Sequence, residues 1–551
     1  MILFFKRIRS IVEAFSVRER ITFWSALVVA IVGGITLLGF VWGNFTKIVP
    51  ARGGSYTEGI VGQPTYVNPV IATSETDKEL VRLLFANLKT LAEKIEASSD
   101  SRTWTVRLKE NLRWSDRERL TSDDIVFTIE QIQSAETASP LFSAWQGVLP
   151  RRVSEQEIEF RLSVPYAFFA YNLERLYPIP KHIFGDVPSP NWKIAESRLK
   201  PVGSGPYTFE KYSITQNGFI RDYTLKANND YAGGNPFIPK FSIVFFADKE
   251  GALAAFNLGH IDGIGNMEAT DLLSVQRPYE VHSLALPGYY AIFINQNKNL
   301  AAKDLAVRTA LSYAIDRTAI VSSTLGGYVS PLISLLPEEH NSSTTASFAS
   351  LQIEAERILD EDGWKRGEDE VRRKEMRGGS ISLTMTITTP ETGALVGVAN
   401  EVRNAWQSIG AEVTVKTVSL ADIQEHDIKN RDYEFLLFGN ILSPTLDLYP
   451  FWHSSERFYP GSNLALYSNK TVDALIESAR QSADPETREK KLKEASAAIQ
   501  NDVPAIFLFS PSYLYLSTKD LRGIGAATIA ESADRFVDVA SWHLKTARTL
   551  K

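Results

Sequence analysis

One stretch near the start of the chain constrains its fold more than any other. Residues 21–43, ITFWSALVVAIVGGITLLGFVWG, run for 23 positions without a charged side chain. As an α-helix rising 1.5 Å per residue, this segment is roughly 34 Å long, which is enough to cross a bilayer. A buried helix of a soluble domain is rarely so uniformly apolar. We therefore predict a membrane span.

Basic residues are more frequent before this segment than directly after it. Those before it are Lys6, Arg7, Arg9, Arg18 and Arg20, and those after it are Lys47 and Arg52. By the positive-inside rule, the N-terminus is cytoplasmic and everything beyond residue 44 is outside. A cleaved signal peptide is the alternative, but the apolar region is too long and no small-x-small cleavage site follows closely. We expect an uncleaved, single-pass anchor in the cell membrane, with a periplasmic or cell-surface domain.

Length and composition exclude several classes of protein. A chain of 551 residues is too long for one core, and three or four folding units are expected. The absence of cysteine excludes disulfides, thiol catalysis, iron–sulfur clusters, cysteine-bound zinc and a lipid-modified N-terminal cysteine. A net charge of −6, from 59 basic and 65 acidic residues, gives no general case for nucleic-acid binding.

Motifs for enzymatic chemistry are missing from the sequence. There is no G-x-S-x-G, no H-E-x-x-H, and no local pair among the seven histidines at metal spacing. Asp123 and Asp124 begin a predicted helix, where carboxylates act as caps. The glycines of PVGSGPYTF, residues 201–209, lack the following Lys-Ser/Thr of a phosphate loop, and Pro206 blocks a helix start, so we predict a turn into a strand. We expect no enzyme, cofactor or metal.

Strand and helix patterns alternate along the chain, which indicates an α/β fold. The clearest unit begins with an apolar strand at residues 289–294 and a polar turn at 295–299. Asp304 then caps a helix and can pair with Arg308 one turn on. Apolar residues follow at helical spacing and give the helix one core-facing stripe.

The amino-acid sequence of this unit, YYAIFINQNKNLAAKDLAVRTALSYAIDRTAIV at residues 289–321, resembles a segment of a known protein family. The family is that of the extracytoplasmic solute-binding proteins of peptide-class ABC importers, family 5, of the oligopeptide, dipeptide and nickel-binding type. TWTVRLKENLRWSDRERLTSDDIVFTIEQ at 103–131 and PVGSGPYTFEKY at 201–212 are similar to further segments of it. The resemblance covers nearly everything from residue 55 to 544. About a dozen residues that relatives carry after residue 88 are absent here.

The resemblance implies an α/β fold with two hinged lobes of the periplasmic-binding-protein type. An extra α+β domain is inserted in the first lobe, and one transmembrane helix precedes the whole. Crossings between the lobes are expected near residues 289–295 and 504–509. The expected divisions are a cytoplasmic N-terminus at 1–20, the anchor at 21–43, a linker at 44–54, lobe I at 55–88, 200–288 and 505–545, the inserted domain at 89–199 and lobe II at 289–504.

The resemblance also implies a function and partners. We expect the membrane-anchored substrate-binding component of an ABC importer, a monomer that captures oligopeptides between its lobes. Its partners would be the permease and ATPase subunits of the importer and the membrane, but no nucleic acid. The alternatives are the same fold binding a non-peptide solute, such as a nickel complex or a sugar, and a sensory receptor without a transporter.

Ligand contacts follow from the same resemblance. In peptide-binding relatives, an acid a few positions beyond the glycine matching Gly439 holds the peptide amino group. Here Ser443 stands four residues after that glycine, and Asp447 is the first acid. If Ser443 takes the anchor position, the ligand is not a free peptide N-terminus; if the loop is shifted, Asp447 can hold the amino group. That Asp447 is only a turn carboxylate is an equal alternative. Aromatic positions expected at the cleft can also be core residues. The full expected set is Thr73, Ser74, Glu75, Thr76, Phe142, Trp145, Gly439, Asn440, Ile441, Ser443, Asp447, Phe507 and Phe509.

Overall fold

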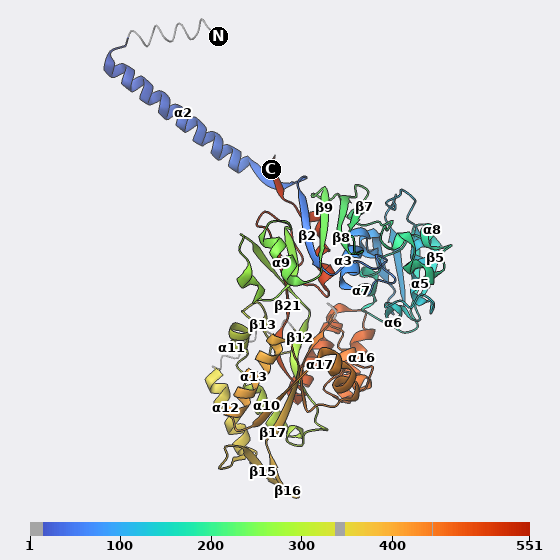
Figure 1. Cartoon of the computed structure of the whole chain (residues 1–551), viewed down its shortest axis with the longest axis vertical. Coiled ribbons are helices and arrows are strands. Elements are labelled where there is room, and N and C mark those ends of the chain that lie inside the picture. Colours follow the sequence, from blue (N-terminus) through green and yellow to red (C-terminus); the bar gives the residue numbers. More distant parts are fainter. Residues whose placement is uncertain (1–14, 337–347, 443–444) are drawn as a thin grey trace.

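A computed structural model describes residues 15–336, 348–442 and 445–551 of the chain (Figure 1). The first described helix, α2 (Val17–Phe45), contains the apolar segment predicted at 21–43. The segment Val17–Leu37 of this helix is long and apolar enough to cross a membrane, and it is not buried against the rest of the protein. Most of the predicted cytoplasmic segment 1–20 lies outside the described residues.

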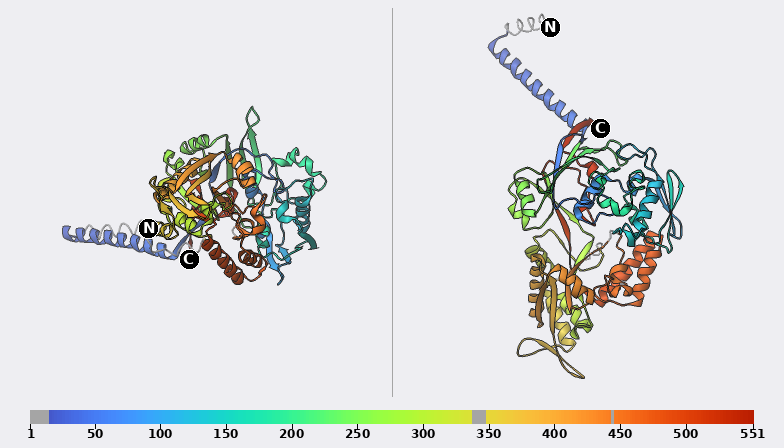
Figure 2. Two further views of the ribbon diagram at one scale, coloured as in Figure 1. Left: turned by 90° about the horizontal axis from the view of Figure 1, so that it is seen from below. Right: turned by 45° about the vertical axis from the view of Figure 1, so that its right-hand side comes forward.

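The predicted linker at 44–54 is wrong for most of its length. Strand β1 (Thr46–Ala51) follows α2 directly and pairs antiparallel with β22 (Lys545–Leu550), from Thr46 opposite Leu550 to Ala51 opposite Lys545. The Lys551 N–H donates to the carbonyl of Phe45 at 3.0 Å. Figures 1 and 2 show the C-terminus at the base of α2. Because the partner strand comes from the other end of the sequence, local composition gave no sign of this pairing.

Lobe I is built on a seven-stranded mixed sheet of order β11-β21-β10-β2-β9-β8-β7, in which β2 runs parallel to β9 and β10. Its strands are β2 (Ser55–Val61), β7 (Tyr207–Ile214), β8 (Ile220–Ala227), β9 (Lys240–Phe246), β10 (Gly263–Met267), β11 (Glu280–Ala285) and β21 (Ser512–Ser517). Its helices are α3 (Glu75–Leu84), α9 (Lys249–Asn257), η3 (Asp271–Ser274), η9 (Ser532–Phe536) and η10 (Val539–Ser541).

The inserted domain carries a four-stranded antiparallel sheet of order β3-β4-β6-β5. Its strands are β3 (Ala92–Ala97), β4 (Thr103–Leu108), β5 (Leu149–Ser154) and β6 (Glu157–Arg161). Its helices are α4 (Leu88–Leu91), α5 (Ser122–Gln133), α6 (Phe142–Trp145), α7 (Phe169–Glu174), α8 (Lys181–Phe184), η1 (Ser189–Lys193) and η2 (Glu196–Arg198). Asp124 forms a capping box with Thr121 at the start of α5, as a helix cap should. One continuous hydrophobic core joins this domain to lobe I.

Lobe II is built on a six-stranded sheet of order β13-β20-β12-β19-β17-β18. Its strands are β12 (Gly288–Ile294), β13 (Ser330–Pro331), β17 (Thr384–Pro390), β18 (Glu412–Val418), β19 (Phe435–Ile441) and β20 (Ala505–Ser510), with a hairpin sheet of β14 (Lys365–Arg366), β15 (Arg372–Met376) and β16 (Gly379–Ser382). Its helices are η4 (Ala301–Lys303), α10 (Leu305–Tyr313), α11 (Arg317–Ala319), η5 (Ile320–Thr324), α12 (Phe348–Glu361), α13 (Gly393–Ser408), α14 (Leu420–Asp422), η7 (Ile423–Ile428), α15 (Tyr449–Trp452), η8 (Ser454–Arg457), α16 (Lys470–Gln481) and α17 (Pro485–Asp502).

The chain passes between the two large sheets twice. It leaves lobe I between β11 and β12, through residues 286–287, and it returns between β20 and β21, at Pro511. All but one residue of each predicted crossing, at 289–295 and 504–509, falls inside β12 and β20, which pair with each other in the lobe II sheet. The lobe I boundary expected at 505 is therefore displaced by one strand, because an apolar run does not reveal which of two sheets it joins.

The glycines of the 201–209 motif serve a close backbone approach. A Cβ on Gly203 would lie 1.9 Å from the carbonyl oxygen of Leu84, and one on Gly205 would lie 2.5 Å from the Phe85 nitrogen. The Gly205 N–H donates to that Leu84 carbonyl at 2.9 Å. The motif thus packs against the end of α3 and leads into β7, which confirms the predicted turn into a strand.

Replacing Gly203 by alanine is expected to lower the free energy of unfolding by about 3 kcal/mol, because backbone atoms must move to admit the methyl group. Gly393 is the matched control, since a Cβ there meets nothing within 4 Å. The measurement is the midpoint of urea unfolding, followed by tryptophan fluorescence. Equal midpoints for Gly203→Ala and Gly393→Ala would contradict the close approach.

Candidate ligand-binding site between the lobes

Three neighbouring cavities lie where the lobes and the inserted domain meet. The first, of about 550 Å³, is lined by lobe I residues together with Leu286 of a crossing segment and Ile441 of β19. The second, of about 400 Å³, shares Glu531 with the first. The third, of about 620 Å³, lies between the inserted domain and helix α16. Leu141 lines the second cavity and Ser143 lines the third, so the short helix α6 separates the two.

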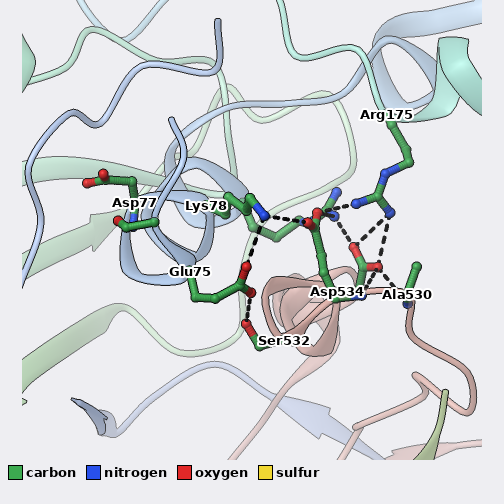
Figure 3. Close-up of polar contacts among 10 residues, drawn as sticks. Glu75, Asp77, Lys78, Arg175, Ala530, Ser532 and Asp534 are labelled. Atoms are coloured by element: carbon green, nitrogen blue, oxygen red, sulfur yellow. Dashed lines mark hydrogen bonds and ion pairs between the residues drawn. The ribbon is translucent and has the colours of Figure 1, made fainter. Parts of the chain in front are cut away.

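The start of α3 forms a wall of the first cavity. Ser74 caps this helix by accepting the Asp77 N–H at 3.1 Å, and Thr76 is buried at the cavity surface. Glu75 pairs with Lys78 at 2.9 Å and accepts a hydrogen bond from Ser532 at 2.6 Å (Figure 3). Burial alone would raise the pKa of Glu75, but these contacts outweigh it and lower the pKa. The carboxylate therefore stays charged.

An ion-pair network continues from this wall into the second cavity (Figure 3). Glu531 lies 3.4 Å from Lys78 and 3.5 Å from Arg82, and it also pairs with Arg175 of the inserted domain. Asp534 pairs with Arg82 and, at 3.1 Å, with Arg175. Lobe I and the inserted domain are therefore joined by charge as well as by a common core. The network fixes the η9 segment against α3.

A buried charge cluster forms part of the wall of the first cavity, which Glu79 and Arg535 line. Arg535 is 1% exposed and bonds Glu58 at 2.9 Å and Glu79 at 2.7 Å. Tyr515 donates to the second Glu58 oxygen at 2.7 Å. One guanidinium thus serves two carboxyl groups. Burial raises the pKa of Glu58 to about 7, against the opposing attraction of Arg535.

This raised pKa predicts a pH effect on stability. Between the ordinary value of 4.5 and about 7, folded Glu58 holds a proton that the unfolded chain has lost. The free energy of unfolding must then fall as pH rises, by about 2 kcal/mol between roughly pH 5 and pH 7 from this group. Glu58→Gln should remove that part of the slope in urea titrations at the two pH values. A slope identical to that of the native chain would contradict the assignment.

Asp447 lies beside the third cavity but is already paired. Its side chain is 8% exposed, and one carboxylate oxygen is 3.2 Å from Arg480 Nε and accepts from the Tyr166 hydroxyl at 3.2 Å. The other oxygen accepts the Tyr449 N–H at 3.2 Å, as a turn carboxylate does. Burial raises the pKa of Asp447 while Arg480 opposes the rise. A ligand amino group would have to displace Arg480 to reach this acid.

Arg480 also joins the inserted domain to lobe II. Its guanidinium lies over the rings of Tyr166 and Tyr449, at 5.0 and 4.3 Å, and its carbonyl accepts the Ala167 N–H at 2.7 Å. Phe168, the next residue of the inserted domain, is buried in the core of lobe II. The third cavity is therefore bounded by a packed contact between two parts of the molecule.

The expected site residues fall into separate groups. Glu75, Thr76 and Ile441 line the first cavity, and Thr73 lines the second. Ser74 is a helix cap, and Phe142 is 39% exposed at the start of α6. Ser443 lies outside the described residues.

The remaining members are packed inside the protein. Asn440 is 7% exposed and contacts the Tyr289 hydroxyl at 3.3 Å, and a Cβ on Gly439 would meet the Tyr290 ring at 2.8 Å. Trp145, Phe507 and Phe509 are 2–4% exposed. Phe507 packs edge-on against Tyr289, and Phe509 stacks on Tyr290. In this structure these three aromatic side chains are core residues rather than cleft walls, because each is buried against neighbouring rings.

Several lining residues were missed from the sequence. Ser532 and Arg535 lie in the short 3₁₀ segment η9 and Glu531 is its N-cap; Ser532 is 457 positions from its partner Glu75 in α3. The one local signal is the pattern from Glu531 to Asp534, which forms a capping box. Within the described ranges, no group of three or more histidine and acidic side chains could hold a metal ion.

The fold and this row of cavities define a class: a two-lobed periplasmic binding protein with a domain inserted in its first lobe. The family model described as "Bacterial extracellular solute-binding proteins, family 5 Middle" matches residues 89–459. The chain belongs to this family, whose members are solute-binding proteins of peptide-class ABC importers. The family resemblance inferred from the sequence is confirmed.

Individual relatives agree with this assignment. The oligopeptide-binding protein AppA of Bacillus subtilis is 28% identical over 497 residues, covering 86% of this chain and 89% of that protein. The structure of AppA with a nonapeptide has a TM-score of 0.63 at 26% identity, covering 90% of this chain and 100% of that one. NikZ of Campylobacter jejuni, solved with Ni(L-His), has a TM-score of 0.67 at 22% identity, covering 89% and 99%, and shows the fold alone.

Proposed function

We propose that this protein captures oligopeptides in the row of three cavities and delivers them to an ABC permease, while α2 holds it at the membrane. The observation that carries the proposal is the first cavity, in which Glu75 and Thr76 of lobe I meet Ile441 of lobe II. A site lined from both lobes is one that hinge closure can complete around a ligand. The peptide bound by the B. subtilis relative supports the choice of ligand.

The shape of the site suits an elongated ligand. The cavities measure about 550, 400 and 620 Å³; the first lies between lobe I and lobe II, the second between lobe I and the inserted domain, and the third between the inserted domain and lobe II. A pocket for one small molecule is typically a single concavity with a few convergent polar groups. A row of cavities with mixed polar and apolar lining instead fits a chain with side chains at intervals. We assign Thr73, Glu75, Thr76 and Ile441 to its walls.

Anchoring and delivery are parts of the same proposal. An unburied apolar helix at the N-terminal end would keep the binding lobes on the extracytoplasmic side of the cell membrane, next to the permease and its ATPase subunits. Tethering raises the effective concentration of the binder at its partner without any added contact. A monomer satisfies this arrangement.

Isothermal titration calorimetry of the full chain in nanodiscs tests capture directly. Peptides of increasing length are titrated, with free amino acids and the nickel–histidine complex as controls. We expect saturable binding of peptides and none of the controls. Saturable binding of nickel–histidine in place of peptides would overturn the choice of ligand.

A further inference from the structure

The segment that follows α2 and the C-terminal segment together form a basic surface next to this helix. Residues 44–54, NFTKIVPARGG, and 544–551, LKTARTLK, contain no acidic side chain. Pairing of β1 with β22 gathers their five basic residues on one two-stranded ribbon, here called the basic collar. Its members are Lys47, Arg52, Lys545, Arg548 and Lys551. All five are exposed, and none forms an ion pair within the described residues.

The collar has few internal contacts to explain its charge. Arg52 donates to the Asn229 side chain at 2.9 Å, and Arg548 donates to the Thr46 hydroxyl at 3.0 Å. Lys545 also lines a cavity that includes Asp262 and Asp520, at the lobe I end of the ribbon. The charge is therefore least compensated at the other end, where Lys47, Arg548 and Lys551 adjoin α2. A carboxylate on residue 551 would offset one charge and leave the collar positive.

The length of α2 places that end just outside the headgroup layer. Its 29 residues span about 43 Å, close to the full thickness of a bilayer with its headgroups. Ile48 and Arg548 face each other three positions beyond Phe45, which is about 10 Å along a strand. This distance is about one Debye length at 0.1 M salt, so the charges act on the membrane surface. Phe45 and Leu550, 64% and 74% exposed, are the adjoining apolar side chains.

We propose that the basic collar binds the anionic headgroups of phospholipids in the extracytoplasmic leaflet, so that lobe I rests on the membrane surface. The inference depends on the anchoring part of the proposed function. The far end of the ribbon is fixed to lobe I, because the Gly53 N–H donates to the Phe237 carbonyl at 2.8 Å and the backbones of Arg522 and His543 form an antiparallel β-bridge. Lobe I is then the stationary lobe, and lobe II is the one that moves over it.

The test uses the full chain with Thr549→Cys, which is the single thiol of that variant and carries a fluorophore. Nanodiscs contain phosphatidylcholine with or without phosphatidylglycerol, and the same amount of a headgroup-labelled quenching lipid. We expect stronger quenching with phosphatidylglycerol, and loss of the difference near 1 M salt, where the Debye length is about 3 Å. Each collar residue neutralised to glutamine should weaken the docked state about fivefold.

Matched variants separate the collar from general charge effects. The combined change Lys47→Gln, Lys545→Gln, Arg548→Gln and Lys551→Gln should abolish the lipid dependence. Lys365→Gln with Arg377→Gln, in the hairpin at the opposite end of the molecule (Figure 1), should leave it intact. Equal quenching in both lipids at low salt, or dependence on an added permease, overturns the proposal. Carbonate extraction reports separately whether α2 is inserted, and calorimetry reports peptide capture.

Discussion

Replacing Arg535 by methionine is expected to lower the free energy of unfolding by about 3–5 kcal/mol at neutral pH. The guanidinium is fully buried between Glu58 and Glu79, and its loss leaves two carboxyl groups in the core without a cation. The cost should grow as pH rises, because a charged Glu58 carboxylate is harder to bury than a protonated one. Trp542 packs against Tyr56 and Tyr515 in this core, so its fluorescence reports the transition in urea.

A matched variant tests whether unpaired charge is the cause. In the triple change Glu58→Leu, Glu79→Leu and Arg535→Met, the whole cluster becomes apolar, and buried ion clusters replaced in this way often lose little stability or gain some. We expect this variant to recover most of the lost stability. If Arg535→Met unfolds at the same urea concentration as the native chain, the pairing of Arg535 with Glu58 and Glu79 does not stabilise the fold.

Cross-linking Ser532→Cys to Ile441→Cys is expected to weaken peptide capture at least about 100-fold, which corresponds to about 2.7 kcal/mol. Both residues line the first cavity, one from lobe I and one from lobe II. A link between them stops the lobes from separating, and a ligand that enters between lobes needs that separation. The chain has no cysteine of its own, so a reducible bis-maleimide reacts only with the introduced pair.

Reduction of the linker should restore capture, which excludes damage by the substitutions. The control pair is Thr208→Cys with Lys226→Cys, which face each other on β7 and β8 within lobe I. A link there leaves the lobes free to move and should leave affinity unchanged. Undiminished binding by the Ser532–Ile441 cross-linked form would show that ligand does not enter through the first cavity.

Local sequence signals predicted much of the fold. The unit at 289–321 appears as β12, η4 and α10, with Asp304 as the cap of α10 and Val307 and Leu311 buried on its inner face. The prediction that Asp304 pairs with Arg308 was wrong. Asp304 pairs with Lys374 at 2.8 Å. Arg308 instead donates to backbone carbonyls, among them that of Asp502.

Contacts across long sequence separations could not be predicted in the same way. The pairing of β1 with β22, the bond from Ser532 to Glu75, and the pair of Arg535 with Glu58 each join segments more than 450 positions apart. No period or cap in either segment identifies its partner. The aromatic residues show the same limit, since Phe507 and Phe509 occupy an apolar strand whose two faces both turned out to be buried.

Native mass spectrometry of the full chain, purified from the cells that produce it, tests the central claim most directly. The cavity row lined from both lobes predicts a ladder of bound masses that peptides account for. Protein that is purified without bound ligand should show the same series of bound peptide masses after incubation with a peptide mixture. A single non-peptide mass, or an empty protein that takes up no peptide from the mixture, would contradict peptide capture and leave only the fold and the family.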